Sequence, residues 1–173
     1  MKKYFFIGLL TLSFFGLCIH SANATSDSLQ KEHGHLMAKA NAFFSANKSE
    51  IETRMKKTDR LAIAGTKDTS GAKSLIKLYL SDSAFYQTVV RHGDSLIYVL
   101  RAHDKLVNET MQKGNLSDKF LTENEEKIYK VKWVITYAKD TAKQVEKRLK
   151  ITNKELKKMR DDIATQKKKE QKK

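Results

Sequence analysis

Apolar residues recur at alternating spacings of three and four through the C-terminal part of the chain. With Ile128 as position a of a heptad, the a positions are Ile128, Ile135, Ala142, Leu149, Leu156 and Ile163. The d positions are Val131, Ala138, Val145, Thr152, Met159 and Gln166. This spacing puts a narrow apolar seam along one face of one long helix, and such a seam must be buried against other helices. The pattern therefore predicts an all-α protein.

Two earlier stretches carry comparable apolar seams. In the middle of the chain, one set of core positions is Leu75, Asp82, Val89, Leu96, His103 and Thr110, and the other is Leu78, Phe85, His92, Val99 and Leu106. Nearer the N-terminus the stripe is wider and less regular, and its apolar residues are Leu29, Leu36, Met37, Ala40, Phe43, Phe44, Ile51 and Met55. These amphipathic segments predict two further helices.

Few residues in the chain interrupt helices. Proline, which breaks them, is absent, and glycine, which commonly ends them, occurs seven times. We expect Gly65 to end the first helix and Gly114 to end the second. Ser70 is the predicted N-cap of the second helix, and Thr122 with Glu125 would form a capping box at the start of the third.

Long helices that are joined by short loops must alternate in direction. The helices are expected at residues 27–64, 71–113 and 122–166. They would form one domain, residues 25–166, followed by a lysine-rich tail at 167–173 that is frayed or disordered. The chain is therefore predicted to be an elongated antiparallel three-helix bundle with coiled-coil-like heptads.

The N-terminus has the organisation of a secretory signal peptide. Two lysines precede an apolar run over residues 4–17, and small residues follow at Ala22 and Ala24. We expect cleavage after Ala24, which predicts a periplasmic or secreted protein without a permanent transmembrane anchor. Cleavage would also remove Cys18, the only cysteine, so that disulfides and thiol chemistry are excluded from the mature chain.

The alternating directions allow residues to be paired by their level along the bundle. Residue n of the first helix should lie opposite about residue 136 − n of the second, and residue n of the second opposite about residue 236 − n of the third. Asp82 then shares a level with Arg54 and Lys154. We expect it to pair with one of these two cations and to fix the register of the helices.

The histidines are the only candidates for a metal site. The same reflection places His103 level with His33 and Trp133, and His35 lies within one turn of His33. Converging imidazoles in a helical bundle can bind zinc, copper or nickel. We weigh a site of His33, His35 and His103 against a hydrogen-bonded core histidine, and favour the second. No cofactor is therefore expected.

Positive charge is concentrated near the C-terminus. The chain has a net charge of +14, and residues 143–173, termed the basic end, hold thirteen lysines and arginines against five acids. A run of this kind is either a solvated face or a binding surface for an anionic partner. The residues of the predicted surface are Lys147, Arg148, Lys150, Lys154, Lys157, Lys158, Arg160, Lys167, Lys168 and Lys169.

The predicted partner is a protein of the bacterial envelope or of a secretion system, with an anionic surface as an alternative. Nucleic acid is disfavoured, because the lysines lack interleaved aromatic residues and outnumber the arginines. Homo-oligomerisation is left open. In size, basic charge and helical content the chain is similar to periplasmic holding chaperones of the Skp type, although it lacks the strand-forming segments through which those proteins trimerise.

Motifs of enzymes were sought and not found. The sequence has no glycine-rich phosphate loop, no nucleophile elbow, no zinc-binding helix motif and no haem-attachment motif. We therefore expect a non-enzymatic helical interaction protein, a scaffold or an accessory subunit of an envelope or secretion assembly. The alternatives are a periplasmic holding chaperone or carrier for anionic or unfolded clients, and a periplasmic metal-binding bundle.

Overall fold

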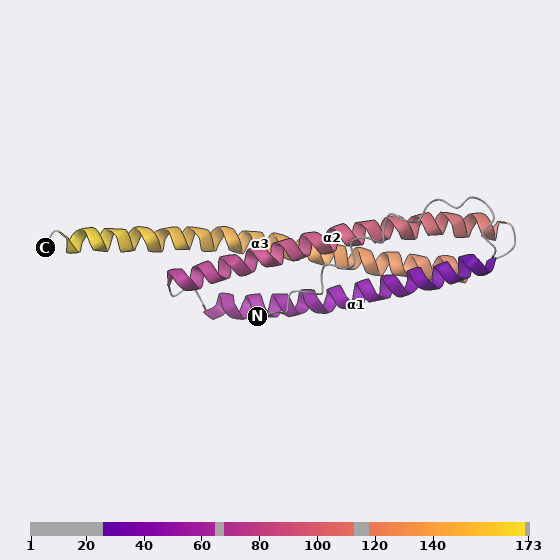
Figure 1. The fold of residues 1–173 in the computed structure, drawn as a ribbon, viewed down its shortest axis with the longest axis horizontal. Coiled ribbons are helices and arrows are strands. Elements are labelled where there is room, and N and C mark those ends of the chain that lie inside the picture. The colour runs from indigo at the N-terminus through magenta and orange to yellow at the C-terminus, as the bar shows by residue number, and fades with distance from the viewer. Residues whose placement is uncertain (1–25, 65–67, 113–117, 172–173) are drawn as a thin grey trace.

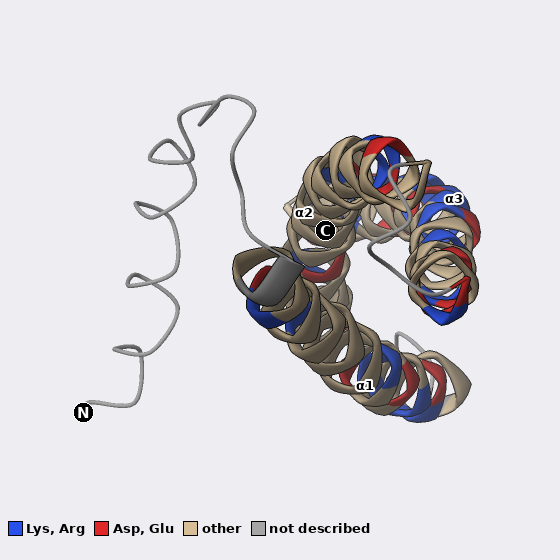
Figure 2. Cartoon of the chain, turned by 90° about the vertical axis from the view of Figure 1, so that its right-hand side faces the viewer, with Lys and Arg blue, Asp and Glu red and all other residues tan. Residues whose placement is uncertain are grey.

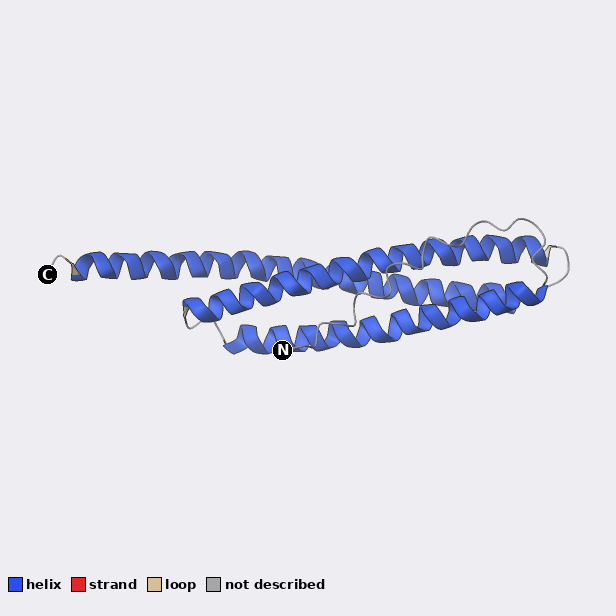
Figure 3. Cartoon of the chain, viewed as in Figure 1, coloured by secondary structure: helices blue, strands red, loops and turns tan. Residues whose placement is uncertain are grey.

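The structure, a computed structural model, describes residues 26–64, 68–112 and 118–171. It contains three helices, α1 (Ser26–Ala64), α2 (Thr69–Met111) and α3 (Lys119–Glu170), and no strand within those ranges (Figures 1 and 3). The predicted all-α class is therefore confirmed. The predicted signal peptide lies outside the described residues, as do the two expected helix-ending glycines, Gly65 and Gly114.

The three helices lie side by side in a long, thin rod. The colour gradient of Figure 1 shows that α2 runs back along α1, and that α3 runs back along α2. α2 and α3 share the most extensive interface, and α1 packs against both (Figure 2). α3 is the longest helix, and its C-terminal part projects beyond the end of the rod at which α1 ends and α2 begins (Figure 1).

The core of α2 differs in part from the predicted seam. The first predicted set is buried from Leu75 to His103, but in the second set His92 is exposed. The second buried row instead lies four residues after each member of the first row, at Tyr79, Tyr86, Gly93, Leu100 and Val107. The residues three positions and four positions after each member of the first row are both mostly apolar. The packing of α2 against its two neighbouring helices therefore decides which of these two rows is buried.

The seam of α3 is buried only where neighbouring helices cover it. The buried residues are Asn124, Val131, Val134, Ile135, Ala138, Thr141, Val145, Thr152 and Leu156. Ile163 and Gln166 occupy predicted core positions but are exposed. The heptad therefore continues past the last residues of α1 and α2 that could bury it.

The N-termini of α2 and α3 were wrongly predicted. Asp68, rather than Ser70, caps α2, because its side chain accepts a 2.6 Å hydrogen bond from the Gly71 backbone N–H. α3 begins at Lys119, within the expected loop, so that Thr122 lies inside the helix. The hydroxyl of Thr122 donates to the Asp118 carbonyl at 3.4 Å, and no capping box forms.

The C-terminus of α3 extends further than expected. The helix continues to Glu170, four residues into the predicted tail, and all its residues from Arg160 onward are exposed. Lysine and glutamine are good helix formers, and the lysines of the last turn interact favourably with the helix dipole. Residues 172–173 lie outside the described residues.

The two predicted registers had different outcomes. Between α1 and α2, His33 meets His103 and Arg54 meets Asp82, as the reflection predicted. Between α2 and α3, the Asn124 amide reaches the Leu100 carbonyl, about three turns from the predicted level. The helix boundaries explain part of this error, because α2 ends two residues and α3 begins three residues earlier than expected.

Gly93 allows the three helices to approach one another. A Cβ atom at this position would lie 2.5 Å from Ile135 Cγ1 and 3.1 Å from Phe43 Cζ. Gly93→Ala is therefore expected to lower the free energy of unfolding by about 1–3 kcal/mol through overpacking, despite the better helix propensity of alanine.

Gly34 provides the matched control for this prediction. It also lies within a helix, but it is exposed, and a Cβ atom there would have no neighbour within 4 Å. Gly34→Ala should raise the free energy of unfolding by about 0.5–1 kcal/mol. Urea denaturation of both variants measures the difference, and equal changes would contradict the close packing at Gly93.

Candidate functional site

The basic end is mostly solvent-exposed. Of the ten residues in the predicted surface, Lys147, Lys150, Lys154, Lys157, Lys158, Arg160, Lys167, Lys168 and Lys169 are exposed. The exception is Arg148, which is half-buried and donates to Asp59 of α1 at 2.6 Å. Lys150 forms an ion pair with Glu146 one turn earlier, at 2.9 Å. Most of this charge is therefore directed to solvent, and Arg148 ties α3 to α1.

A groove of about 620 Å³ opens beside the Arg148–Asp59 pair, where α1 approaches its end. It is lined by Asp59, Ala62, Ile63, Leu75, Tyr79, Arg148, Ile151, Thr152 and Glu155. Ile63 and Ile151 are 85% and 57% exposed. The groove is thus apolar, with charges of both signs at its margin.

A second hollow, of about 310 Å³, lies between the start of α2 and the projecting part of α3. Its lining residues, Thr69, Lys73, Arg160, Ile163, Ala164 and Lys167, define what we term the α2–α3 hollow. It combines an apolar floor with three cationic side chains. Arg160 and Lys167 belong to the predicted surface, whereas Lys73 and Ile163 were not assigned to it.

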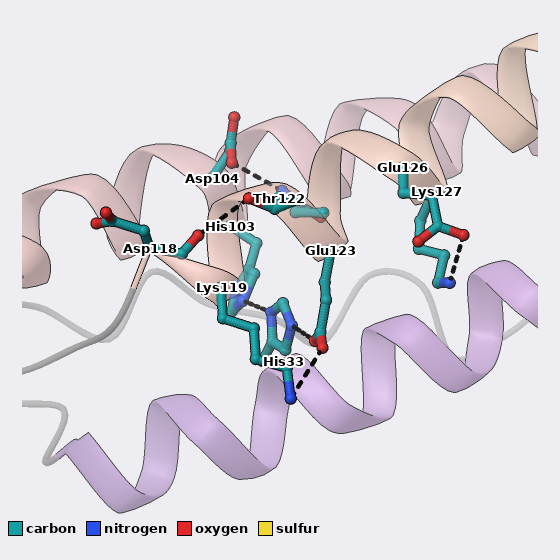
Figure 4. A network of polar contacts seen from close by, with 10 residues as sticks. His33, His103, Asp104, Asp118, Lys119, Thr122, Glu123, Glu126 and Lys127 are labelled. Carbon is teal, nitrogen blue, oxygen red and sulfur yellow. Dashed lines mark hydrogen bonds and ion pairs between the residues drawn. The ribbon is translucent and has the colours of Figure 1, made fainter.

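His33 and His103 form a polar cluster with Glu123 at the opposite end of the bundle (Figure 4). His33 Nδ1 lies 3.1 Å from His103 Nε2, and His33 Nε2 lies 3.1 Å from Glu123 Oε2. Both imidazoles are buried, and the Phe120 ring packs edge-on against His33 at 4.6 Å. Because the Glu123 carboxylate can only accept, neutral His33 carries its proton on Nε2 and accepts from His103 Nε2–H.

Burial controls the proton affinity of this cluster. Desolvation, reinforced by the neighbouring His33, lowers the pKa of His103 from 6.5 to about 4, and Asp104 opposes this change only weakly. The hydrogen bond from His33, together with Lys119 at 3.6 Å, lowers the pKa of Glu123. At neutral pH, a neutral His103 therefore lies close to an ionised Glu123.

The predicted metal site is only partly assembled. His33 and His103 come together, but His35 is exposed, away from their contact. Within the described ranges, no three His, Cys, Asp or Glu side chains are close enough to hold a metal ion. The Nδ1 atom of His103 has no hydrogen-bond partner. The arrangement supports a hydrogen-bonded histidine pair more directly than a metal centre.

Asp82 lies in a second buried polar cluster. Its side chain is fully buried and accepts from Arg54 at 2.9 Å and from the Thr58 hydroxyl at 2.7 Å. Of the two predicted cations, Arg54 is therefore the partner, and Lys154 is exposed. Thr58 was missed, although it lies one turn after Arg54 and so on the same face of α1.

Asn124 links α2 and α3 and was also missed. Its amide group donates to the Leu100 carbonyl at 2.9 Å and to Asp104 at 3.0 Å. Asn124 is fully buried, although its neighbours in the sequence are Glu123 and Glu125. The signal in the sequence was its position, seven residues before Val131 and therefore at a d position of the heptad.

Comparison of the chain with protein-family models, curated proteins and solved structures finds no match. None of the described helices is both long and apolar enough to cross a membrane.

Proposed function

We propose that the protein is an exported, non-enzymatic interaction protein that binds its partner through the basic end. It would serve as a scaffold or an accessory subunit of a bacterial envelope or secretion assembly. The periplasmic or secreted location rests on the signal peptide predicted from residues 1–24.

The observation that carries this proposal is the projection of α3 beyond the other helices (Figure 1). From Arg160 to Glu170 every side chain is exposed, and Ile163 still follows the heptad. A helical segment of this kind has little tertiary support, and isolated helices of its length are marginal in water. A partner that packs against it would bury Ile163 and stabilise the segment.

The proposal is tested by cross-linking and purification of the tagged, full-length protein from the envelope of its source organism. One partner recovered in a fixed ratio is the expected result. A broad set of unfolded proteins, released on refolding, would favour the holding chaperone instead. Recovery of the protein alone, with no cross-linked partner, would contradict the proposal.

Replacement of Lys167, Lys168 and Lys169 by glutamine is expected to reduce recovery of that partner several-fold and to weaken its salt dependence. Exposed charges act over only about 8 Å at physiological ionic strength, so these contacts should be sensitive to added salt. The melting temperature should stay unchanged, because the three side chains are exposed in the last turn of α3.

The control replaces three exposed cations at the opposite end of the rod, Lys31, Arg101 and Lys105. It makes the same change in net charge. Equal loss of the partner in both triple variants would show that total charge, rather than the basic end, controls binding.

A further inference from the structure

The α2–α3 hollow has a floor of exposed apolar side chains. Ile163 is 44% exposed and lies beside Ala164. Leu80, which is 55% exposed, follows Lys73 by seven residues and so lies on the same face of α2. This flank of the helix pair therefore presents apolar surface to solvent near the end of the bundle.

The walls of the hollow carry only positive charge. Lys73 comes from α2, and Arg160 and Lys167 come from α3, where they are seven residues apart and share one face. Asp161 and Asp162 directly follow Arg160, but residues one and two apart do not face the same way on a helix. Neither aspartate lines the hollow, and Glu170, one turn after Lys167, also lies outside its lining.

The groove beside Arg148 lacks this charge pattern. Asp59 and Glu155 line it together with Arg148, so that its margin has no single sign. The two openings are therefore chemically distinct, although both lie near the junction of α1 and α2 with α3.

We propose that the α2–α3 hollow docks an acidic amphipathic helix of a partner protein. Its apolar stripe would contact Ile163 and Ala164, and its flanking Asp and Glu side chains would pair with Lys73, Arg160 and Lys167. A helix suits this place because an amphipathic helix can lay its apolar face on the exposed face of α3 beside the start of α2. This inference rests on the proposed function and specifies its partner.

Charge argues against a second copy of this chain as the occupant. The chain has a net charge of +14, and its basic end would bring lysines against lysines. An acidic helix replaces that repulsion with attraction at each of the three cations.

The test measures the binding of labelled synthetic helices to the full-length protein by fluorescence anisotropy. The probe is an amphipathic peptide of about twenty residues, with leucine at positions spaced three and four apart and glutamate on both flanks. One control peptide carries lysine in place of glutamate, and another has the same composition in scrambled order. We expect the acidic amphipathic peptide to bind at least about tenfold more tightly than either control.

Ile163→Asp and Ile151→Asp form a matched pair of variants. Both isoleucines are exposed residues of α3, but Ile163 lines the α2–α3 hollow and Ile151 lines the groove beside Arg148. Ile163→Asp should weaken binding of the acidic peptide about tenfold or more, whereas Ile151→Asp should change it less than about twofold. Circular dichroism checks that both variants fold.

Arg160→Gln with Lys73→Gln provides a test that does not alter the apolar floor. This double variant should weaken binding several-fold and reduce its salt dependence. The proposal is overturned if the isoleucine variants behave alike, if the peptides bind equally, or if phosphatidylglycerol vesicles bind at this hollow and the acidic peptide does not. If the wild type and Ile163→Asp recover the same envelope partner equally well, the proposed function stands and this hollow is excluded.

Discussion

Arg54→Met is expected to lower the free energy of unfolding by about 3–5 kcal/mol, because it leaves the fully buried carboxylate of Asp82 without its cation. Among the described residues, Thr58 would remain as the only donor to that carboxylate. Methionine retains much of the apolar contact made by the stem of Arg54, so the loss should come chiefly from the uncompensated charge. Urea denaturation at pH 7 measures the change.

Asp82→Leu should be much milder, within about 1 kcal/mol of the wild type, or even stabilising. Arg54 would keep its 2.7 Å hydrogen bond to Glu50 and its position 4.3 Å from the centre of the Phe85 ring, and its side chain is 27% exposed to water. The double variant Arg54→Met with Asp82→Leu should regain most of the stability lost by Arg54→Met. If Asp82→Leu is as harmful as Arg54→Met, the buried charge is not the cause.

The second large effect is a loss of stability in mild acid, caused by His103. Well above pH 6.5 this histidine is neutral in both the folded and the unfolded chain. As the pH falls toward 4, the unfolded chain takes up the proton at its usual pKa, whereas burial keeps the folded chain from doing so. The wild type should lose about 2 kcal/mol between pH 7 and pH 5 from this residue alone.

The charged and titratable groups around His103 determine the pH range over which this residue dominates the loss of stability. His33 from α1 adds to the cost of charging His103, and Asp104 from α2 reduces it. Glu123 from α3, whose pKa is lowered, stays ionised between pH 7 and pH 5. The titration of Glu123 would therefore remove stability only at lower pH.

His103→Gln and His92→Gln separate this effect from general acid sensitivity. Glutamine at position 103 can still donate to His33, but it does not titrate. His92 lies on the same helix and is exposed. The free energy of unfolding should depend less on pH in His103→Gln than in the wild type, and its pH dependence should be unchanged in His92→Gln. If His103→Gln lost as much stability in acid as the wild type does, the assignment to His103 would be contradicted.

The sequence allowed the helices and the α1–α2 register to be predicted, because long amphipathic segments and a short connection leave few alternatives. The contacts His33–His103 and Arg54–Asp82 followed directly from that register. The α2–α3 register was wrong in part because reflection transmits every error in a helix boundary along the whole helix. The exact start of α3 depends on a helix end without a side-chain cap, for which the sequence holds no strong signal.

Other errors came from competition between nearly equivalent residues. Asp68 and Ser70 are both good N-caps, and only the geometry of the Gly71 amide distinguishes them. In α2, Tyr86 and Phe85 could each follow Asp82 in an apolar row, and the position of the neighbouring helices selects Tyr86. The basic end was evident from composition, but the α2–α3 hollow required Lys73 to be placed beside Arg160, which only the fold provides.

The two buried polar clusters restrict how the helices can slide along the long axis of the rod. Apolar heptads alone are nearly periodic, so that a shift of one helix by seven residues would exchange one similar layer for another. Such a shift of α1 against α2 would replace Arg54 opposite Asp82 by Asn47 or Leu61, and would leave a buried carboxylate without a cation. We expect these clusters to select one alignment among several that the apolar seams would tolerate.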